Sequence, residues 1–265
     1  MSSDIVLIKL GGSLITDKAR EEKPRREVIE RLTGEIARVA AERPYRLIVG
    51  HGSGSFGHVV AERFGLAAGI RSAAQLTGIS LTQERAAMLH RYVIGGLSDA
   101  GARPFSIAPS SCVVAAAGRP VSFTDEPLLL AFERGLLPVL YGDVVMDREQ
   151  GAAVCSTERL FEMVAGRLLE RGWTVRRAVW LGETDGLYDA EGRTVPRVSA
   201  ENFAAAAQAI GDPAGADVTG GMRHRLETAL ALARLGIPSL LVNGLTPGLL
   251  ERAVQGGPVP GTSVL

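Results

Sequence analysis

Short apolar runs alternate along the chain with longer segments in which apolar residues recur every three or four positions. The runs are rich in β-formers and are bounded by Gly, Pro, Asp or Ser, which is typical of strands. They occupy residues 5–10, 46–50, 103–108, 137–142, 176–182, 238–243 and 262–265. Several of these runs are apolar on both faces, as expected for strands of a parallel sheet that is covered on both sides.

The segments between the runs show helical periodicity. Apolar stripes with spacings of three to four residues are formed by Val28, Leu32, Ile36 and Val39, by Leu160, Met163, Val164 and Leu168, and by Leu226, Leu230, Ala233 and Leu235. Thr246-Pro247 predicts the N-cap and first turn of a further helix, which Gly256-Gly257 would close. This alternation predicts the α/β class, as an open αβα sandwich with a mainly parallel central sheet.

Two segments depart from simple strand-helix alternation. Residues 66–100 form a long helical stretch that contains Gly78, Gly95 and Gly96 and could be a lid over a substrate. Residues 212–221, DPAGADVTGG, are the best candidate for a flexible loop. Because the sequence has no repeat and no low-complexity linker, we expect residues 1–265 to form one domain.

Composition restricts the partners of this domain. The 29 basic and 29 acidic side chains cancel, so no global field attracts nucleic acid or a membrane, and an anionic ligand needs a local site. Cys112 and Cys155 form no C-x-x-C pair and no Cys/His cluster, which argues against a disulfide framework and a protein metal site. The N-terminus lacks the pattern of a signal peptide, and no apolar run is long enough to span a bilayer. We therefore expect a soluble, cytoplasmic protein.

The segment GHGSGSFGH, residues 50–58, follows the second predicted strand and has two interpretations. Gly52, Gly54 and Gly57 spell the G-x-G-x-x-G fingerprint of dinucleotide-binding folds. That site favours an acidic residue about 20 positions on, at the end of a strand, whereas the sequence around Arg71 has neither. The remaining interpretation is a phosphate-binding loop that opens a helix, with His58 in the first turn.

Two further glycine pairs predict anion-binding loops. The first predicted strand runs into KLGGS, where Lys9 precedes Gly11 and Gly12, although a tight turn with a solvated lysine would give the same pattern. Near the C-terminal end, DVTGGMRHR places two glycines before a helix that carries Arg225. Three such loops indicate a polyphosphate and a second anion.

The motifs KLGGSLITDK, GSGSFGH, YGDVV, TDGLY and DVTGGM, in this order, resemble the amino acid kinase superfamily over essentially the whole chain. The histidine that ends GSFGH resembles the isopentenyl phosphate kinase branch and the related fosfomycin kinases. The resemblance implies the amino acid kinase fold, a homodimer, an acceptor lobe at about residues 1–170 and an ATP-binding lobe at about residues 171–265. It also implies transfer of a phosphoryl group from ATP, with Mg²⁺, to isopentenyl phosphate for isoprenoid synthesis in the mevalonate pathway.

The resemblance assigns roles residue by residue. Lys9, Lys18 and His58 would be catalytic. The residues expected to bind ATP are Lys9, Gly11, Gly12, Ser13, Lys18, Asp185, Gly186, Tyr188, Thr219, Gly220 and Arg225. The residues expected to bind the small-molecule acceptor are Gly52, Ser53, Gly54, Gly57, His58, Gly142, Asp143 and Glu158.

Three positions depart from the pattern of the resemblance. Glu158 stands where many relatives have aspartate, Arg225 stands where they have lysine, and GETDG at residues 182–186 replaces TDVDG. Two alternative functions stay open: a fosfomycin or other small phosphonate or phosphate kinase, since the phosphate-binding motifs do not distinguish acceptors, and a nucleotide-binding protein without catalysis, which the changes at Glu158 and Arg225 would permit. Acceptor choice would depend on apolar side chains of the segment 66–100, for which we name Ile79, Leu81, Met88, Tyr92 and Ile94; helix packing is their alternative role.

Overall fold

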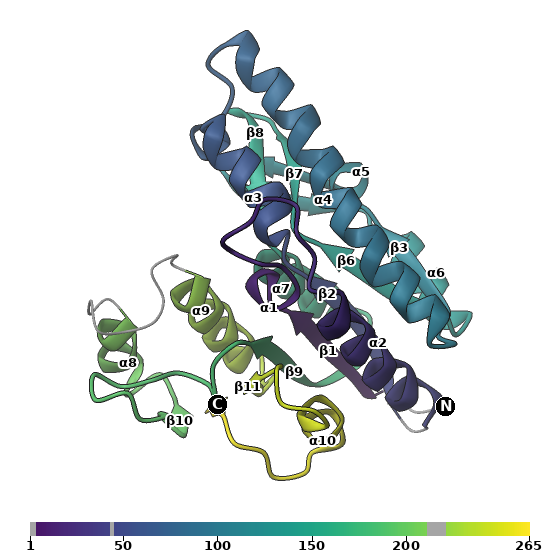
Figure 1. Cartoon of the computed structure of the whole chain (residues 1–265), viewed down its shortest axis with the longest axis vertical. Coiled ribbons are helices and arrows are strands. Elements are labelled where there is room, and N and C mark those ends of the chain that lie inside the picture. Colours follow the sequence, from purple (N-terminus) through teal and green to yellow (C-terminus); the bar gives the residue numbers. More distant parts are fainter. Residues whose placement is uncertain (1–3, 43–44, 211–220) are drawn as a thin grey trace.

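The computed structural model of the chain describes residues 4–42, 45–210 and 221–265. Thr219 and Gly220 of the predicted nucleotide site lie outside the described residues, as does nearly all of the predicted flexible loop 212–221. Figure 1 shows the described chain as a twisted central sheet with helices on both of its faces.

The central sheet has eight strands in the order β10-β12-β11-β9-β1-β2-β6-β3. They are β1 (Asp4–Leu10), β2 (Arg46–His51), β3 (Pro104–Ile107), β6 (Leu137–Tyr141), β9 (Thr174–Gly182), β10 (Arg197–Val198), β11 (Ser239–Asn243) and β12 (Thr262–Val264). All neighbours are parallel except β12, which runs antiparallel to β11. The seven strands predicted from the apolar runs are present, so the mainly parallel sheet is confirmed.

Helices follow most of these strands, as the periodicity predicts. They are α1 (Gly12–Ile15), α2 (Arg26–Ala41), α3 (Gly54–Arg63), α4 (Ala73–Asp99), α5 (Pro109–Cys112), α6 (Glu126–Glu133), α7 (Thr157–Glu170), α8 (Phe203–Ile210), α9 (Gly221–Arg234) and α10 (Leu249–Gln255), with a short 3₁₀ turn at Leu66–Ala68. The long helix α4 confirms the predicted helical stretch in residues 66–100.

The strand β1 separates two hydrophobic cores because successive side chains of a strand point to opposite faces. Ile5 and Leu7 belong to the core that packs the sheet against α6, α7 and α9. Val6 and Ile8 belong to the core that packs it against α2, α4 and α10. The three layers confirm the predicted αβα sandwich.

A second sheet of four strands, β5-β4-β7-β8, was not predicted. Its strands are β4 (Val113–Ala116), β5 (Arg119–Phe123), β7 (Asp143–Asp147) and β8 (Gly151–Cys155). The part of YGDVV that continues past the predicted run 137–142 is therefore the strand β7. These strands have only four or five residues, and segments such as VVAA in β4 and DVVMD in β7 show no regular alternation of apolar and polar side chains in the sequence.

The last helix starts later than predicted. Residues 244–248 form turns, and α10 begins at Leu249 after Gly248, which has φ +76°. The prediction of a Thr246-Pro247 start is therefore wrong, because the turn after β11 is completed before the helix begins. The predicted end is confirmed: Gly256 follows the last turn with φ +85°, a conformation that favours glycine.

Candidate active site

Two glycine loops at the carboxyl ends of β1 and β2 are in direct contact. A methyl group added to Gly12 would lie 2.6 Å from the nitrogen of Gly54, and one added to Gly52 would lie 2.9 Å from the nitrogen of Gly12. Carbon atoms of side chains do not approach backbone this closely, so glycine is required at both positions. Two anions bound by these two loops would therefore be neighbours.

Four backbone N–H groups of the loops have no acceptor among the described residues. They belong to Gly12 and Ser13 after β1 and to Ser53 and Gly54 after β2. Successive unsatisfied N–H groups in a turn form a concave surface that binds anions. The second loop also opens the helix α3, whose dipole adds partial positive charge at this end.

Gly11 and Gly52 use their N–H groups within the protein. The N–H of Gly11 donates to the carbonyl of Leu181 at 2.8 Å, and that of Gly52 donates to the carbonyl of Leu10 at 3.0 Å. The N–H groups of these two residues are therefore engaged within the protein, and their expected binding of ATP and acceptor stays a prediction. Their contribution is space, since a side chain at Gly11 would strike the carbonyl of Leu181.

Thr16 ties the two loops together and was missed in the sequence. Its hydroxyl donates to the carbonyl of Gly12 at 2.8 Å and accepts from the N–H of Ser55 at 3.0 Å. Gly54 adopts φ +49°, and a side chain there would collide with Thr16. The spacing of Thr16 from the glycines matches no motif used above, so only the fold reveals this connection.

Lys9 and Glu158 form a buried ion pair between the end of β1 and the start of α7. Burial lowers the pKa of Lys9 although Glu158 opposes that effect, and the charge of Arg225 lowers it further. Burial alone would raise the pKa of Glu158, but the charges of Lys9 and Arg225 outweigh burial and lower this pKa to about 2. Glu158 therefore stays ionised. Its carboxylate is buried and contacts Lys9.

Arg225, on the helix α9, lies close enough to Lys9 and Glu158 for its charge to affect both. Its side chain is buried. A carbon added at Gly182 would lie 2.8 Å from one nitrogen of the guanidinium, and a carbon added at Gly11 would lie 3.4 Å from another. Glycine at the ends of β1 and β9 thus makes room for the guanidinium. The ATP-phosphate role expected of Arg225 stays a prediction.

Lys18 lies apart from this buried cluster and is half exposed. Its ammonium is 3.7 Å from the carboxylate of Glu183, which also accepts a hydrogen bond from Arg25 at 2.7 Å. Glu183 belongs to the variant segment GETDG, so the first acidic position of that segment contacts the loop that follows β1. The sequence did not indicate this contact or Arg25.

His58 lies on an exposed part of α3, one turn after Gly54. Gly57 next to it is buried, and a carbon added there would lie 3.4 Å from Ala86 of α4. The tighter contact of such a carbon is with the side chain of Ser53, at 3.0 Å, so Gly57 mainly makes room for the loop. The accessibility of His58 leaves its imidazole available to a ligand.

Gly142 and Asp143 occupy different surroundings although they are adjacent. A carbon at Gly142 would lie 3.5 Å from the nitrogen of Ser53, so Gly142 borders the second loop. The carboxylate of Asp143 is buried and accepts hydrogen bonds from the N–H groups of Ser110 and Val144. Burial raises the pKa of Asp143 against the effect of these bonds. Its hydrogen bonds therefore hold the turn into β7.

The expected nucleotide residues Asp185, Gly186 and Tyr188 form one turn after β9. The amide of Asn243 donates to Asp185 at 3.0 Å, and the N–H of Asp185 donates to the hydroxyl of Tyr188 at 3.2 Å. Gly186 has φ +105° and lies against Thr262. The structure thus brings these three together beside Asn243 at the end of β11.

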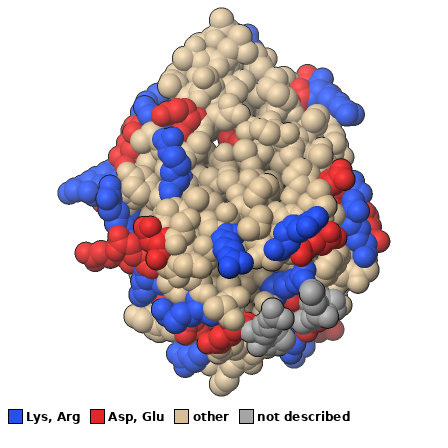
Figure 2. Space-filling model, turned by 90° about the vertical axis from the view of Figure 1, so that its right-hand side faces the viewer, with Lys and Arg blue, Asp and Glu red and all other residues tan. Residues whose placement is uncertain are grey.

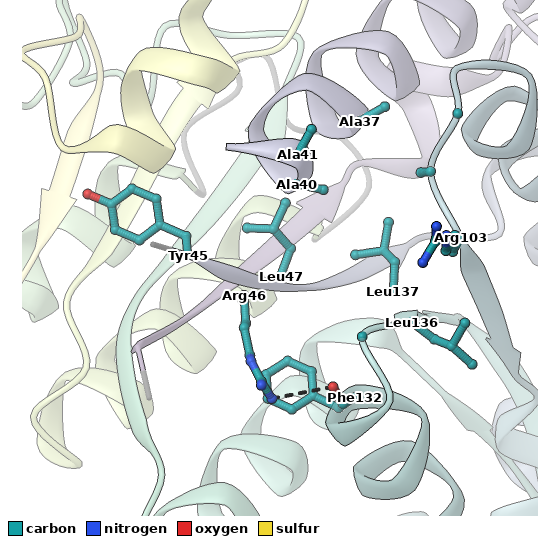
Figure 3. A pocket seen from close by; sticks show the side chains of 13 residues that line it. Ala37, Ala40, Ala41, Tyr45, Arg46, Leu47, Arg103, Phe132, Leu136 and Leu137 are labelled. Atoms are coloured by element: carbon teal, nitrogen blue, oxygen red, sulfur yellow. Dashed lines mark hydrogen bonds between the residues drawn. The ribbon is translucent and has the colours of Figure 1, made fainter. Parts of the chain in front are cut away.

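A cleft of about 540 Å³ lies elsewhere, at the amino ends of β2 and β6. Figure 3 shows Ala37, Ala41, Leu47 and Leu137 along it and the guanidinium of Arg46 beside the ring of Phe132. This guanidinium donates to the carbonyl of Phe132. The cleft contains none of the glycine loops, so shape alone does not mark the candidate active site.

Adjacent anion-binding loops, a buried lysine and a buried arginine are what phosphoryl transfer requires, because that reaction depends on positioning and charge neutralisation. The fold and site define a phosphotransferase. The chain belongs to the amino acid kinase family, whose model matches residues 4–243. Membership of a kinase family makes ATP the phosphate donor.

Similar proteins are isopentenyl phosphate kinases. That of Methanothermobacter thermautotrophicus is 32% identical over 98% of this chain and 98% of its own length. That of Haloferax volcanii is 30% identical over 94% of this chain and 98% of its own length. A solved isopentenyl phosphate kinase structure superposes with a TM-score of 0.81 at 30% identity, over 98% of this chain and 99% of the other.

Two further findings concern metals and membranes. Within residues 4–42, 45–210 and 221–265, no group of three His, Cys, Asp or Glu side chains is arranged to hold a metal ion. No helix of the described parts of the chain combines the length and the apolar character needed to cross a bilayer.

Proposed function

We propose that the protein transfers the γ-phosphoryl group of ATP to isopentenyl phosphate, which gives isopentenyl diphosphate and ADP. The observation that carries this proposal is the contact between the Gly12 loop and the Gly54 loop, each with two unsatisfied N–H groups. One loop suits the phosphate that is transferred, and the other suits a second anion. In isopentenyl phosphate this second anion is the phosphate group that accepts the transferred phosphoryl group. The similarity to isopentenyl phosphate kinases over nearly the whole chain supports this acceptor.

On the donor side, Gly12 and Ser13 would bind the ATP phosphates through N–H groups, and Lys9, Lys18 and Arg225 would neutralise them. Lys9 is held toward the loops by Glu158, so its ammonium is fixed before ATP binds. Asp185, Gly186, Tyr188, Thr219 and Gly220 would contact the rest of the nucleotide, which assigns this role to the lobe at about residues 171–265.

On the acceptor side, Ser53 and Gly54 would bind the phosphate through N–H groups, bordered by Gly142, and His58 would contact it from the side. A phosphate is already a nucleophile at neutral pH, so the site needs no strong general base. The role of His58 is then to orient the acceptor and offset the repulsion between two anions. This side belongs to the proposed acceptor lobe at about residues 1–170.

Mg²⁺ would arrive with ATP. Several acidic side chains around the site are already engaged: Glu158 by Lys9, Glu183 by Arg25 and Asp143 by the N–H groups of Ser110 and Val144. The described residues thus fit a Mg²⁺ ion held mainly by phosphate oxygens and water, as is usual for this ion. Its chemistry when bound is to neutralise charge on the β- and γ-phosphates.

The apolar tail would extend toward the first half of α4. Residues 73–83 carry no charged side chain, and Figure 2 shows an almost uncharged surface at the upper end of the molecule, where α4 begins. Of the five tail candidates, Met88, Tyr92 and Ile94 pack against the core and Ile79 packs near Ala61 and Leu66. Leu81 is 36% exposed and remains the candidate that a tail could cover.

A coupled ADP-release assay tests this proposal. With MgATP, isopentenyl phosphate is compared with fosfomycin at matched concentrations, and a sample without acceptor measures ATP hydrolysis. We expect turnover with isopentenyl phosphate well above the sample without acceptor. Turnover with fosfomycin alone would assign the protein to antibiotic modification, and ATP binding without turnover on either would favour a non-catalytic nucleotide-binding protein.

A further inference from the structure

Two buried histidines that the proposed reaction does not use lie directly behind the acceptor loop. His51 is the last residue of β2 and immediately precedes Gly52, and His90 projects from α4. Both imidazoles are buried, with exposed fractions of 0% and 5%. Burial lowers the pKa of His51 to about 4 and that of His90 to about 2, so both rings are neutral at physiological pH.

A chain of hydrogen bonds connects these rings to the loop. Nδ1 of His51 is 3.0 Å from the carbonyl oxygen of Gly52, and Nε2 of His51 is 2.9 Å from Nδ1 of His90. Nε2 of His90 is 2.7 Å from the hydroxyl of Ser106 on β3. The ring of Tyr141 stacks on His90 with a centroid distance of 4.2 Å, which restricts the rotation of His90.

The carbonyl of Gly52, at one end of this series of hydrogen bonds, determines where each proton in the series lies. A carbonyl oxygen only accepts, so Nδ1 of His51 carries the proton. In a neutral ring Nε2 of His51 is then an acceptor, and Nδ1 of His90 must carry a proton and donate to it. Nε2 of His90 accepts in turn from the hydroxyl of Ser106. Both histidines are therefore Nδ1–H tautomers.

The consequence lies in the peptide between Gly52 and Ser53. The carbonyl of Gly52 and the N–H of Ser53 belong to the same planar unit and point in opposite directions. Holding the carbonyl on the buried His51 ring thus aims the N–H of Ser53, one of the four unsatisfied donors, away from the core. The backbone carbonyl of His51 is itself held by the N–H of Gly142 at 2.9 Å and by the hydroxyl of Thr157 at 2.6 Å.

We infer that His51 is a positioning residue for the acceptor phosphate: with His90 behind it, its imidazole orients the Gly52–Ser53 peptide so that the Ser53 N–H faces the bound anion. This inference rests on the proposed function for the identity of the anion. It assigns a role to a residue one position before the glycine motif that sequence patterns do not mark. His90 does not contact the loop itself; it holds the ring of His51 in place through their hydrogen bond.

Kinetics of three variants test this role. His51→Phe keeps a ring but removes the donor and leaves the carbonyl of Gly52 unsatisfied, so we expect the KM for the acceptor to rise about tenfold while the KM for ATP stays within about twofold. His51→Asn restores a donor near the Nδ1 position and should recover most of the acceptor affinity. Ser98→Ala, at an exposed position near the end of α4 and away from the proposed tail surface, is the matched control. Equal changes in both KM values, or no change, would overturn the inference.

A second measurement is independent of the substrate. Nitrogen-15 spectra of labelled histidine distinguish the two tautomers, and single substitutions assign the signals of the four histidines. We expect both His51 and His90 to be Nδ1–H tautomers. If the neutral ring of His51 carried its proton on Nε2, the proposed series of hydrogen bonds would be wrong, whatever the kinetics of the variants. If the wild type fails to phosphorylate isopentenyl phosphate, the proposed function fails while this measurement still decides the hydrogen-bond chain.

Discussion

Lys9 and Glu158 lie 149 positions apart in the sequence and form an ion pair in the interior of the protein. Removing charges from water costs several kcal/mol for each ion, so a buried pair is weak evidence for a purely stabilising role. We propose instead that the buried ammonium of Lys9, at the end of β1 and beside a glycine loop, binds an anion. The pair connects the first strand to the start of α7 and fixes the ammonium in the absence of ATP.

The contribution of the Lys9–Glu158 pair to stability should decrease at low pH. The pKa of Glu158 lies below its ordinary value of 4.5, so its stabilisation is fully present above pH 4.5 and is lost as the pH falls toward about 2. At neutral pH Glu158→Gln should lower the free energy of unfolding by about 3–5 kcal/mol, because it leaves Lys9 buried without its partner. The difference in melting temperature between wild type and variant should shrink between pH 4.5 and 2; a constant difference would contradict the pairing.

Gly12→Ala should separate the two loops. The added methyl group would collide with the backbone of Gly54, so the loops must move apart, and a displacement of about 1 Å costs on the order of 10²-fold in rate. Gly95→Ala is the matched control, because nothing lies within 4 Å of its added carbon and it lies inside the helix α4. Steady-state kinetics of both variants decide the point. Equal rates for the two would show that contact between the loops is not needed.

His58→Ala should retain ATP binding and lose on the order of 10²-fold in turnover, as for other single electrostatic donors. Because His58 is exposed, its removal should leave the melting temperature nearly unchanged. Glu62→Ala, an exposed position on the same helix, serves as the control. ATP affinity is measured by calorimetry and turnover by ADP release. Normal turnover of the His58 variant would remove the histidine from the proposed site.

Arg225→Lys should raise the KM for ATP by about tenfold and leave the KM for the acceptor nearly unchanged. Lysine keeps the charge but lacks the planar fork of the guanidinium that fits between Gly11 and Gly182. Arg225→Gln, which also loses the charge, should have the larger effect. If both variants instead changed the acceptor KM, Arg225 would belong to the other side of the site.

Local patterns predicted most of the central sheet. Each long apolar run became a strand, because a buried parallel strand needs an uninterrupted apolar stretch, and the glycine pairs marked the turns where backbone must approach backbone. The short strands β4, β5, β7 and β8 were missed, since a strand of four or five residues in a partly exposed sheet leaves little periodicity.

Contacts between distant segments were the least predictable part of the site. Lys9 and Glu158 were both named from motifs, but their pairing depends on how α7 packs against the central sheet. Thr16 and His51 were not named, because a threonine that bridges two loops and a histidine behind a carbonyl follow no spacing rule. Likewise, the sequence marked Gly11 and Gly52 as loop residues, yet only the hydrogen bonds show that their N–H groups are used internally.

Phosphorus-31 NMR of the wild-type reaction tests the central claim most directly. Isopentenyl phosphate and MgATP are incubated with the protein, and the phosphomonoester signal is followed together with those of ATP and ADP. Direct transfer between the two loops predicts that the monoester signal is replaced by two coupled diphosphate signals in step with ADP formation. ADP that accumulates while the monoester signal stays unchanged would contradict transfer to isopentenyl phosphate.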